Sequence, residues 1–116
     1  MTSPRSQERT KLVETAQIEW QPTATPGVHY KLLRSDRETG TQTVLLKFDP
    51  GAQFPSHNHP GGEELYVIEG EIQVGRDHLN AGDYLYTPPG GKHPASSKTG
   101  CLIFVTVGKP IEIIGG

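Results

Sequence analysis

Cysteine is almost missing from this sequence: Cys101 is the one cysteine among 116 residues. No disulfide can therefore form within the chain, which excludes a small secreted domain stapled by disulfides. A reducing compartment follows most simply, so we expect a cytoplasmic protein. Long apolar runs are missing too. The N-terminus has no apolar stretch as long as that of a signal peptide, and no apolar segment elsewhere is long enough to cross a bilayer. This predicts a soluble protein without a membrane partner.

An excess of either charge is also missing. The chain has 11 Lys and Arg residues against 13 Asp and Glu residues, a net charge of -2 at pH 7, and like charges do not form runs. A protein that binds nucleic acid needs a basic surface to neutralise the phosphates. We therefore expect no nucleic-acid partner.

Glycine and proline, by contrast, are plentiful, with 14 and 10 residues. This composition favours short strands joined by tight turns, and from about residue 18 apolar runs alternate with turn signals as in a β-sandwich or barrel. We expect strands at residues 28–33, 41–48, 54–59, 64–70, 71–75, 83–87 and 101–107, with residues 109–116 as an edge strand or a segment packed on a partner. The prediction is one all-β domain at residues 16–116 behind a polar arm or tail at residues 1–15.

Four side chains that commonly bind metals occur in two separate segments. His57 and His59 are two residues apart in an expected strand, so both imidazoles should point the same way. Glu63 follows after a bend at residues 60–62, and we expect one hairpin to supply these three ligands. His93 comes after a turn rich in proline and glycine, and a neighbouring strand is expected to bring it to the same centre.

Imidazole nitrogen together with carboxylate oxygen suits zinc, iron, manganese, nickel or copper, and it offers too few oxygens for calcium. We therefore expect one divalent transition metal ion. Zinc held tetrahedrally by four side chains would leave no position for a substrate, which is typical of a structural or sensing site. Six-coordinate iron, manganese or nickel would leave about two positions, enough for dioxygen and an organic substrate.

These segments match a known pattern. Residues 51–70, GAQFPSHNHPGGEELYVIEG, resemble the first motif of the cupin superfamily, and residues 82–93, GDYLYTPPGGKH, resemble the second. Ser97 stands where the second motif has an asparagine. The segments HPGGEE, PPGGKHPASS and GCLIFV resemble more narrowly the cupin domain of the zinc-containing ChrR-type anti-sigma factors, and acetophenone-cleaving dioxygenases look similar.

The resemblance covers residues 20–107 and implies a double-stranded β-helix, the jelly-roll barrel of cupins, with the metal on His57, His59, Glu63 and His93. It also implies a homodimer and a small-molecule ligand. The function it favours is a metal-dependent enzyme of the dioxygenase type that acts on a small organic substrate. The alternative is a non-catalytic sensor or regulatory module that contains a metal. Catalytic residues beyond the ligands stay unassigned.

Other interpretations of single residues stay open. The four clustered side chains could be hydrogen-bonded core residues in a barrel without a metal, and Glu64 could replace Glu63 as the ligand. Cys101 is either a small buried core residue or a thiol that faces the metal cavity. His29 and His78 lack partners at suitable spacing, so we expect them on the surface or in ordinary hydrogen bonds.

Overall fold

The structure, a computed structural model, describes residues 9–114, so the first eight residues of the expected arm and the last two of the chain lie outside it. None of the helical segments in this range is long and apolar enough to cross a membrane. Ten strands and one 3-10 turn at Thr15–Gln17 make up the described part. The strands are β1 Gln21–Pro22, β2 Val28–Ser35, β3 Gln42–Phe48, β4 Gln53–His59, β5 Glu63–Val74, β6 Asp77–Asn80, β7 Tyr84–Thr87, β8 Gly91–Ser96, β9 Cys101–Val107 and β10 Glu112–Ile113.

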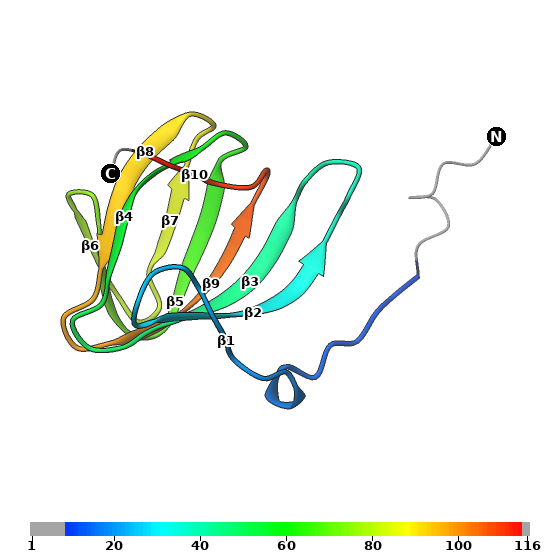
Figure 1. Ribbon diagram of the computed structural model, residues 1–116, viewed down its shortest axis with the longest axis horizontal. Helices are drawn as coiled ribbons and strands as arrows, with labels where there is room; N and C mark the ends of the chain where they lie inside the picture. Colours follow the sequence, from blue (N-terminus) through cyan, green and yellow to red (C-terminus); the bar gives the residue numbers. More distant parts are fainter. Residues whose placement is uncertain (1–8, 115–116) are drawn as a thin grey trace.

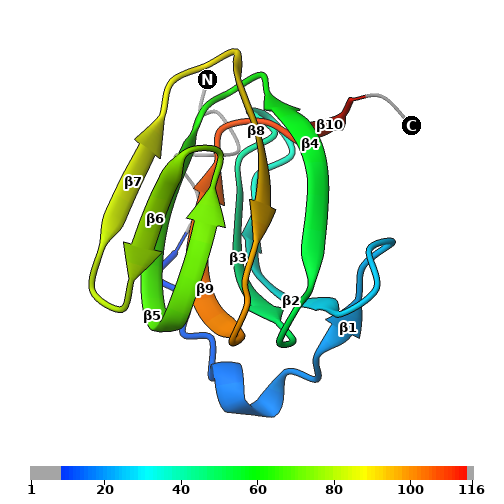
Figure 2. The same cartoon turned by 90° about the vertical axis from the view of Figure 1, so that its left-hand side faces the viewer.

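The strands form two antiparallel layers that face each other and curl into a barrel (Figures 1 and 2). One layer has the order β1-β2-β3-β9-β5-β7. The other has the order β10-β4-β8-β5-β6. The all-β barrel predicted from the composition and the motifs is confirmed.

Strand β5 joins the two layers. Its first half pairs with β7 and β9, and its second half pairs with β6 and β8. The bend lies at Gly70, which has a φ of 79°, and a Cβ atom there would overlap the carbonyl oxygen of Gly100. Only glycine fits this position without strain. The sequence predicted two strands that meet at this glycine, and the structure corrects them to one continuous bent strand.

The core is made by the inward-facing residues of β5 and β9, which alternate with outward-facing ones. Leu65, Val67, Ile103 and Val105 are at most 3% exposed. On the outer side of the same layer, large side chains of β5, β7 and β9 are between 39% and 58% exposed. We call these residues the outer aromatic face: Tyr66, Ile68, Tyr84, Tyr86 and Phe104.

The segment before β1 is attached to the outer side of β2 and β3. The Lys31 ammonium lies 4.7 Å from the centre of the Trp20 ring and donates a hydrogen bond of 2.8 Å to the Thr15 carbonyl. The Lys47 ammonium lies 5.9 Å from the same ring. Further toward the N-terminus the chain leaves the barrel (Figure 1), and Leu12 is 86% exposed.

Candidate metal centre

His57 and His59 lie at the end of β4 and point into the barrel. The alternation of a strand puts both imidazoles on one side, and they are 4% and 0% exposed. The register between β4 and β8 shifts between Phe54 and His57. The Phe54 ring packs edge-on against the His57 ring, with 5.0 Å between their centroids. The same-side orientation expected for the pair is therefore what the structure has.

His93 reaches the pair from the neighbouring strand. Strand β8 lies antiparallel to β4, and His93 is directly opposite His57 in the register. Gly91 is opposite His59, and a Cβ atom on Gly91 would overlap the Thr87 side chain. Glycine at this position lets β8 pass close to the end of β7 and carry His93 into the barrel.

Glu63 comes from the other layer, as the first residue of β5. The expectation of one hairpin that supplies three ligands is wrong, because β4 and β5 do not pair. The connection at residues 60–62 instead crosses from one layer to the other. It does so in close contact with the chain after β9, since a Cβ atom on Gly61 would overlap the backbone of Gly108 and Lys109.

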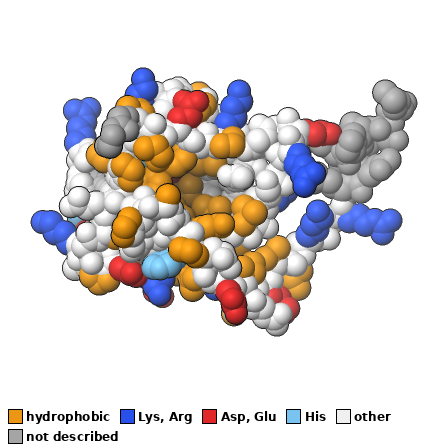
Figure 3. All heavy atoms as spheres, viewed as in Figure 1, with side chains coloured by type: hydrophobic (Ala, Val, Ile, Leu, Met, Phe, Trp, Pro, Cys, Tyr) orange, Lys and Arg blue, Asp and Glu red, His pale blue; other side chains and the backbone are white. Residues whose placement is uncertain are grey.

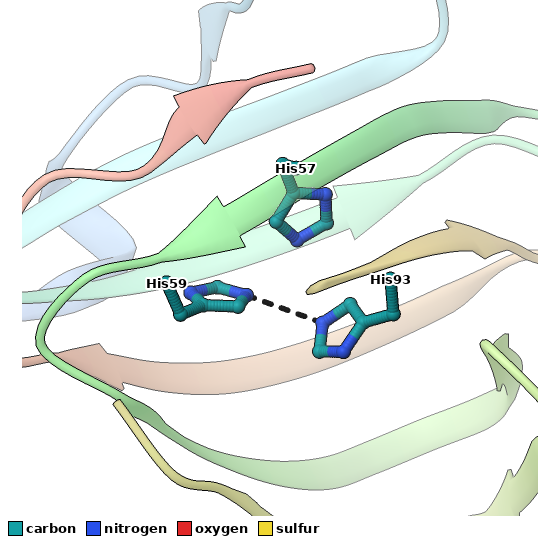
Figure 4. Close-up of side chains that lie close together, drawn as sticks. All are labelled: His57, His59 and His93. Atoms are coloured by element: carbon teal, nitrogen blue, oxygen red, sulfur yellow. Dashed lines mark hydrogen bonds between the residues drawn. The ribbon is translucent and has the colours of Figure 1, made fainter. Parts of the chain in front are cut away.

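The donor atoms of the three histidines converge (Figure 4), and the Glu63 carboxylate lies beside them. The Nε2 atoms of His59 and His93 are 3.1 Å apart, and Glu63 Oε1 is 3.5 Å from each of them. One donor atom from each of His57, His59 and His93 can be chosen so that all lie within 4.8 Å of one another. Neighbouring ligands on a metal with bonds of about 2.1 Å are roughly 3.0–3.4 Å apart, so the shorter separations match those around a single ion.

The Nε2 atoms of His59 and His93 form a hydrogen bond with each other, which a metal ion bound to both would replace. The Pro55 carbonyl accepts a bond of 2.8 Å from His57 Nδ1, which fixes the tautomer with the free electron pair on Nε2. Glu63 Oε1 and His59 Nδ1 are buried without a hydrogen-bond partner. A buried carboxylate oxygen without a partner is costly, because it loses its hydration and gains nothing in return. A cation at this point would give Glu63 the missing partner.

His57 and His59 are suited to bind a metal because burial favours their neutral forms. Burial lowers the pKa of His57, and the nearby His93 adds to this effect. Burial also lowers the pKa of His59 to about 4, against the opposing attraction of Glu63. Metal ligation requires an unprotonated imidazole nitrogen. The donor set, its spacing and the lowered pKa values of His57 and His59 therefore fit a divalent transition metal.

A cavity of about 610 Å³ borders the four side chains. It opens on the face seen in Figure 3, where hydrophobic side chains line the hollow. Among the described residues that line the cavity, Glu63 is the only one that is an Asp, Glu, Lys or Arg. Sequence reasoning missed Tyr30 and Gln42, which also line this cavity. Only their inward positions on expected strands could have indicated them.

The other candidate residues lie elsewhere. Glu64 is exposed and accepts a hydrogen bond of 2.8 Å from the Tyr84 hydroxyl, so it does not replace Glu63. Cys101 is buried but does not line the cavity, and burial raises its pKa to about 11. His78 is exposed and lies 3.1 Å from Gln73. His29 is partly buried on β2 and does not line the cavity.

Comparison with known families agrees with this architecture. The model of the ChrR cupin-like domain family matches residues 8–110. The chain belongs to this family. Its fold is that of a candidate acetylacetone dioxygenase of Methylibium petroleiphilum PM1, whose structure superposes with a TM-score of 0.90 at 23% identity over 99% of this chain and 86% of that one.

Two curated relatives are also similar to this cupin. The DNA damage-repair/toleration protein DRT102 of Arabidopsis thaliana is 34% identical over 87 residues, which are 70% of this chain and 27% of that protein. The acetylacetone-cleaving enzyme of Acinetobacter johnsonii is 28% identical over 78 residues, 67% of this chain and 51% of the enzyme. The chain therefore spans about a quarter and about half of the length of these relatives.

Proposed function

We propose that this cupin is a metal-dependent enzyme of the dioxygenase type that acts on a small organic substrate, with the metal on His57, His59, Glu63 and His93. The observation that carries the proposal is the convergence of four donor atoms on the wall of a large apolar cavity. A metal in that position would supply a Lewis acid for a substrate oxygen and a site for dioxygen. The similarity to the acetylacetone-cleaving enzyme supports this chemistry.

The charge of the site favours an anionic ligand. Three neutral imidazoles and one carboxylate leave a divalent ion with a net charge near +1. The low polarity of the cavity strengthens the attraction between that charge and an enolate or a carboxylate, and a cationic substrate would be repelled. A six-coordinate ion would keep about two positions free for such a ligand.

The test is oxygen consumption by protein loaded with iron, manganese, nickel or zinc, after elemental analysis of protein made without added metal. We expect turnover of at least one member of a panel of diketones and hydroxyketones. His93→Ala should abolish it, whereas His78→Ala, which removes an exposed imidazole, should not. No turnover with any metal and substrate would refute the enzyme.

A second function is favoured by the scarcity of acid and base groups in the cavity. Apart from the four candidate ligands, Tyr30 is the one titratable side chain among the described lining residues. A site without a general base suits a sensor or regulatory module in which zinc is bound for stability. Tight zinc binding without oxygen consumption would support this function over the first.

We also propose that the protein is a cytoplasmic homodimer, with the arm ending near residue 15 and the barrel beginning at residue 16. The outer aromatic face is a large exposed apolar surface of the kind that marks interfaces. Leu12, on the segment that leaves the barrel, is 86% exposed and would be buried only by contact with another subunit. Sedimentation of the wild type and of Tyr86→Lys tests this, with a monomeric wild type as the refuting result.

A further inference from the structure

The cavity is much larger than the metal site needs. At roughly 30 Å³ for each heavy atom, its 610 Å³ would hold at most about twenty such atoms. Cavities of this size usually bind ligands with a substantial apolar body. A five-carbon diketone would leave about two thirds of this volume unfilled.

The cavity also extends along the barrel. Its lining includes Val107, opposite Glu63 at one end of β9, and Phe48, opposite Cys101 at the other end. These ends are about 20 Å apart at the rise of a β-strand. The space therefore suits a ligand that lies along β9, with one end at the histidines.

The wall that faces the histidines is largely apolar, and its polar lining residues Tyr30 and Gln42 carry no formal charge. Val44, Leu46, Ile103 and Val105 line it, and no Lys, Arg or Asp is present among the described lining residues. A second carboxylate or a phosphate would lose its hydration there without gaining a cationic partner. The lining thus selects against such ligands.

We propose that the ligand is an amphiphile, with one monoanionic oxygen head at the metal and an apolar body of about eight to twelve carbon atoms along β3 and β9. The inference of an anionic head rests on the proposed function, because the head binds to the metal. The body depends on the cavity alone. This inference narrows the substrate class from any small organic molecule to one with a long apolar part.

Calorimetric titration with straight-chain carboxylates tests both parts. Nickel-loaded protein, in which a six-coordinate ion would keep about two positions free, is titrated with butanoate, octanoate, decanoate and decanedioate. We expect binding to tighten about threefold for each added methylene, and at least about 100-fold from butanoate to decanoate. Decanedioate should bind at least about 100-fold more weakly than decanoate, because its second carboxylate is desolvated. Equal affinities across the series, or equal binding of decanedioate, would overturn the inference.

Two variants of β3 locate the body. Val44→Phe fills the cavity from its apolar wall, so decanoate should bind at least tenfold more weakly while butanoate is unchanged. Leu45→Phe makes the same kind of change at the next residue, which is absent from the cavity lining, and should change neither affinity. If circular dichroism shows that Val44→Phe does not fold, Leu46→Phe takes its place. Unchanged decanoate binding in the folded variant would overturn the inference.

Metal-free protein separates this inference from the proposed function. A gain with chain length together with equal affinities in nickel-loaded and metal-free protein would support the apolar body and refute a head bound to the metal. Tighter butanoate binding with nickel, but no gain with chain length, would support the metal site and refute the apolar body.

Discussion

The two walls of the barrel differ in regularity. Strands β3 and β9 pair without interruption from Gln42 and Val107 to Phe48 and Cys101. Strands β4 and β8 have a register shift after Phe54, and each contains a proline. We call the first pair the regular wall and the second pair the histidine wall.

The difference in register parallels a difference in what is buried. The regular wall buries Ile103 and Val105, which pack against other apolar side chains and need no hydrogen-bond partners. The histidine wall presents imidazoles, and His59 Nδ1 has no partner in the described structure. Local features that lower stability are expected where a protein binds or reacts. The comparison indicates that the regular wall stabilises the barrel and the histidine wall carries the site.

The largest expected effect is a loss of metal affinity when a histidine of the histidine wall is removed. His93→Ala removes one of the converging donor atoms and should weaken zinc binding at least about 100-fold, since loss of a direct ligand exceeds the 10- to 100-fold effect of losing a group behind one. Competition with a chromogenic chelator measures it. His78→Ala is the control, and equal zinc affinity in His93→Ala and wild type would show that His93 is no ligand.

The next effect concerns the regular wall. Ile103→Ala removes a side chain that is 1% exposed, and the free energy of unfolding should fall by about 2–3 kcal/mol. The adjacent cavity keeps the loss near the lower end of the usual range. Urea denaturation of metal-free protein measures the change.

Phe104→Ala, at the next position on β9, is the control for Ile103→Ala. Phe104 faces outward and is 39% exposed, so its loss should cost about 1 kcal/mol or less in the monomer. Zinc affinity should stay unchanged in both variants. A larger loss for Phe104→Ala than for Ile103→Ala would contradict the assignment of stability to the inner side of this wall.

The same contrast decided what could be predicted from the sequence. The regular wall has alternating apolar and β-branched residues, and its strands at 41–48 and 101–107 were predicted within one residue of their bounds. The expected strand that carries His93 received no bounds, because the prolines and glycines at residues 88–91 and Pro94 are signals of turns. Strand β6 was missed because Leu79 is its one buried residue.

The meeting of the four side chains was predicted better than the strands that carry them. Alternation alone placed His57 and His59 on one side, and the second motif indicated His93. The path of the chain was not predictable in the same way: Glu63 arrives from the other layer because a long-range contact of Gly61 with Gly108 directs the connection. Such contacts leave no local pattern. The cavity is likewise a property of the closed barrel.

The smallest expected effect concerns the loop at the end of the histidine wall. The Glu71 carboxylate accepts hydrogen bonds from the Thr99 amide at 3.0 Å, the Thr99 hydroxyl at 2.9 Å and the Ser97 hydroxyl at 2.9 Å. These bonds lower the pKa of Glu71, the Thr99 amide most strongly. They tie the loop after β8 to β5. Glu71→Gln should therefore lower the free energy of unfolding at pH 7 by about 1–2 kcal/mol.

The sign of the pH dependence follows from the direction of that shift. Because the pKa is lower in the folded protein than the ordinary value of 4.5, the unfolded chain takes up the proton first. The stabilisation by Glu71 is thus fully present above pH 4.5 and is lost as the pH falls below it. Unfolding of wild type and Glu71→Gln from pH 7 to pH 3 should give curves that approach each other in acid. Glu69→Gln, an exposed neighbour, should follow the wild type throughout. A gap between wild type and Glu71→Gln that stays constant down to pH 3 would show that the carboxylate charge does not hold this loop.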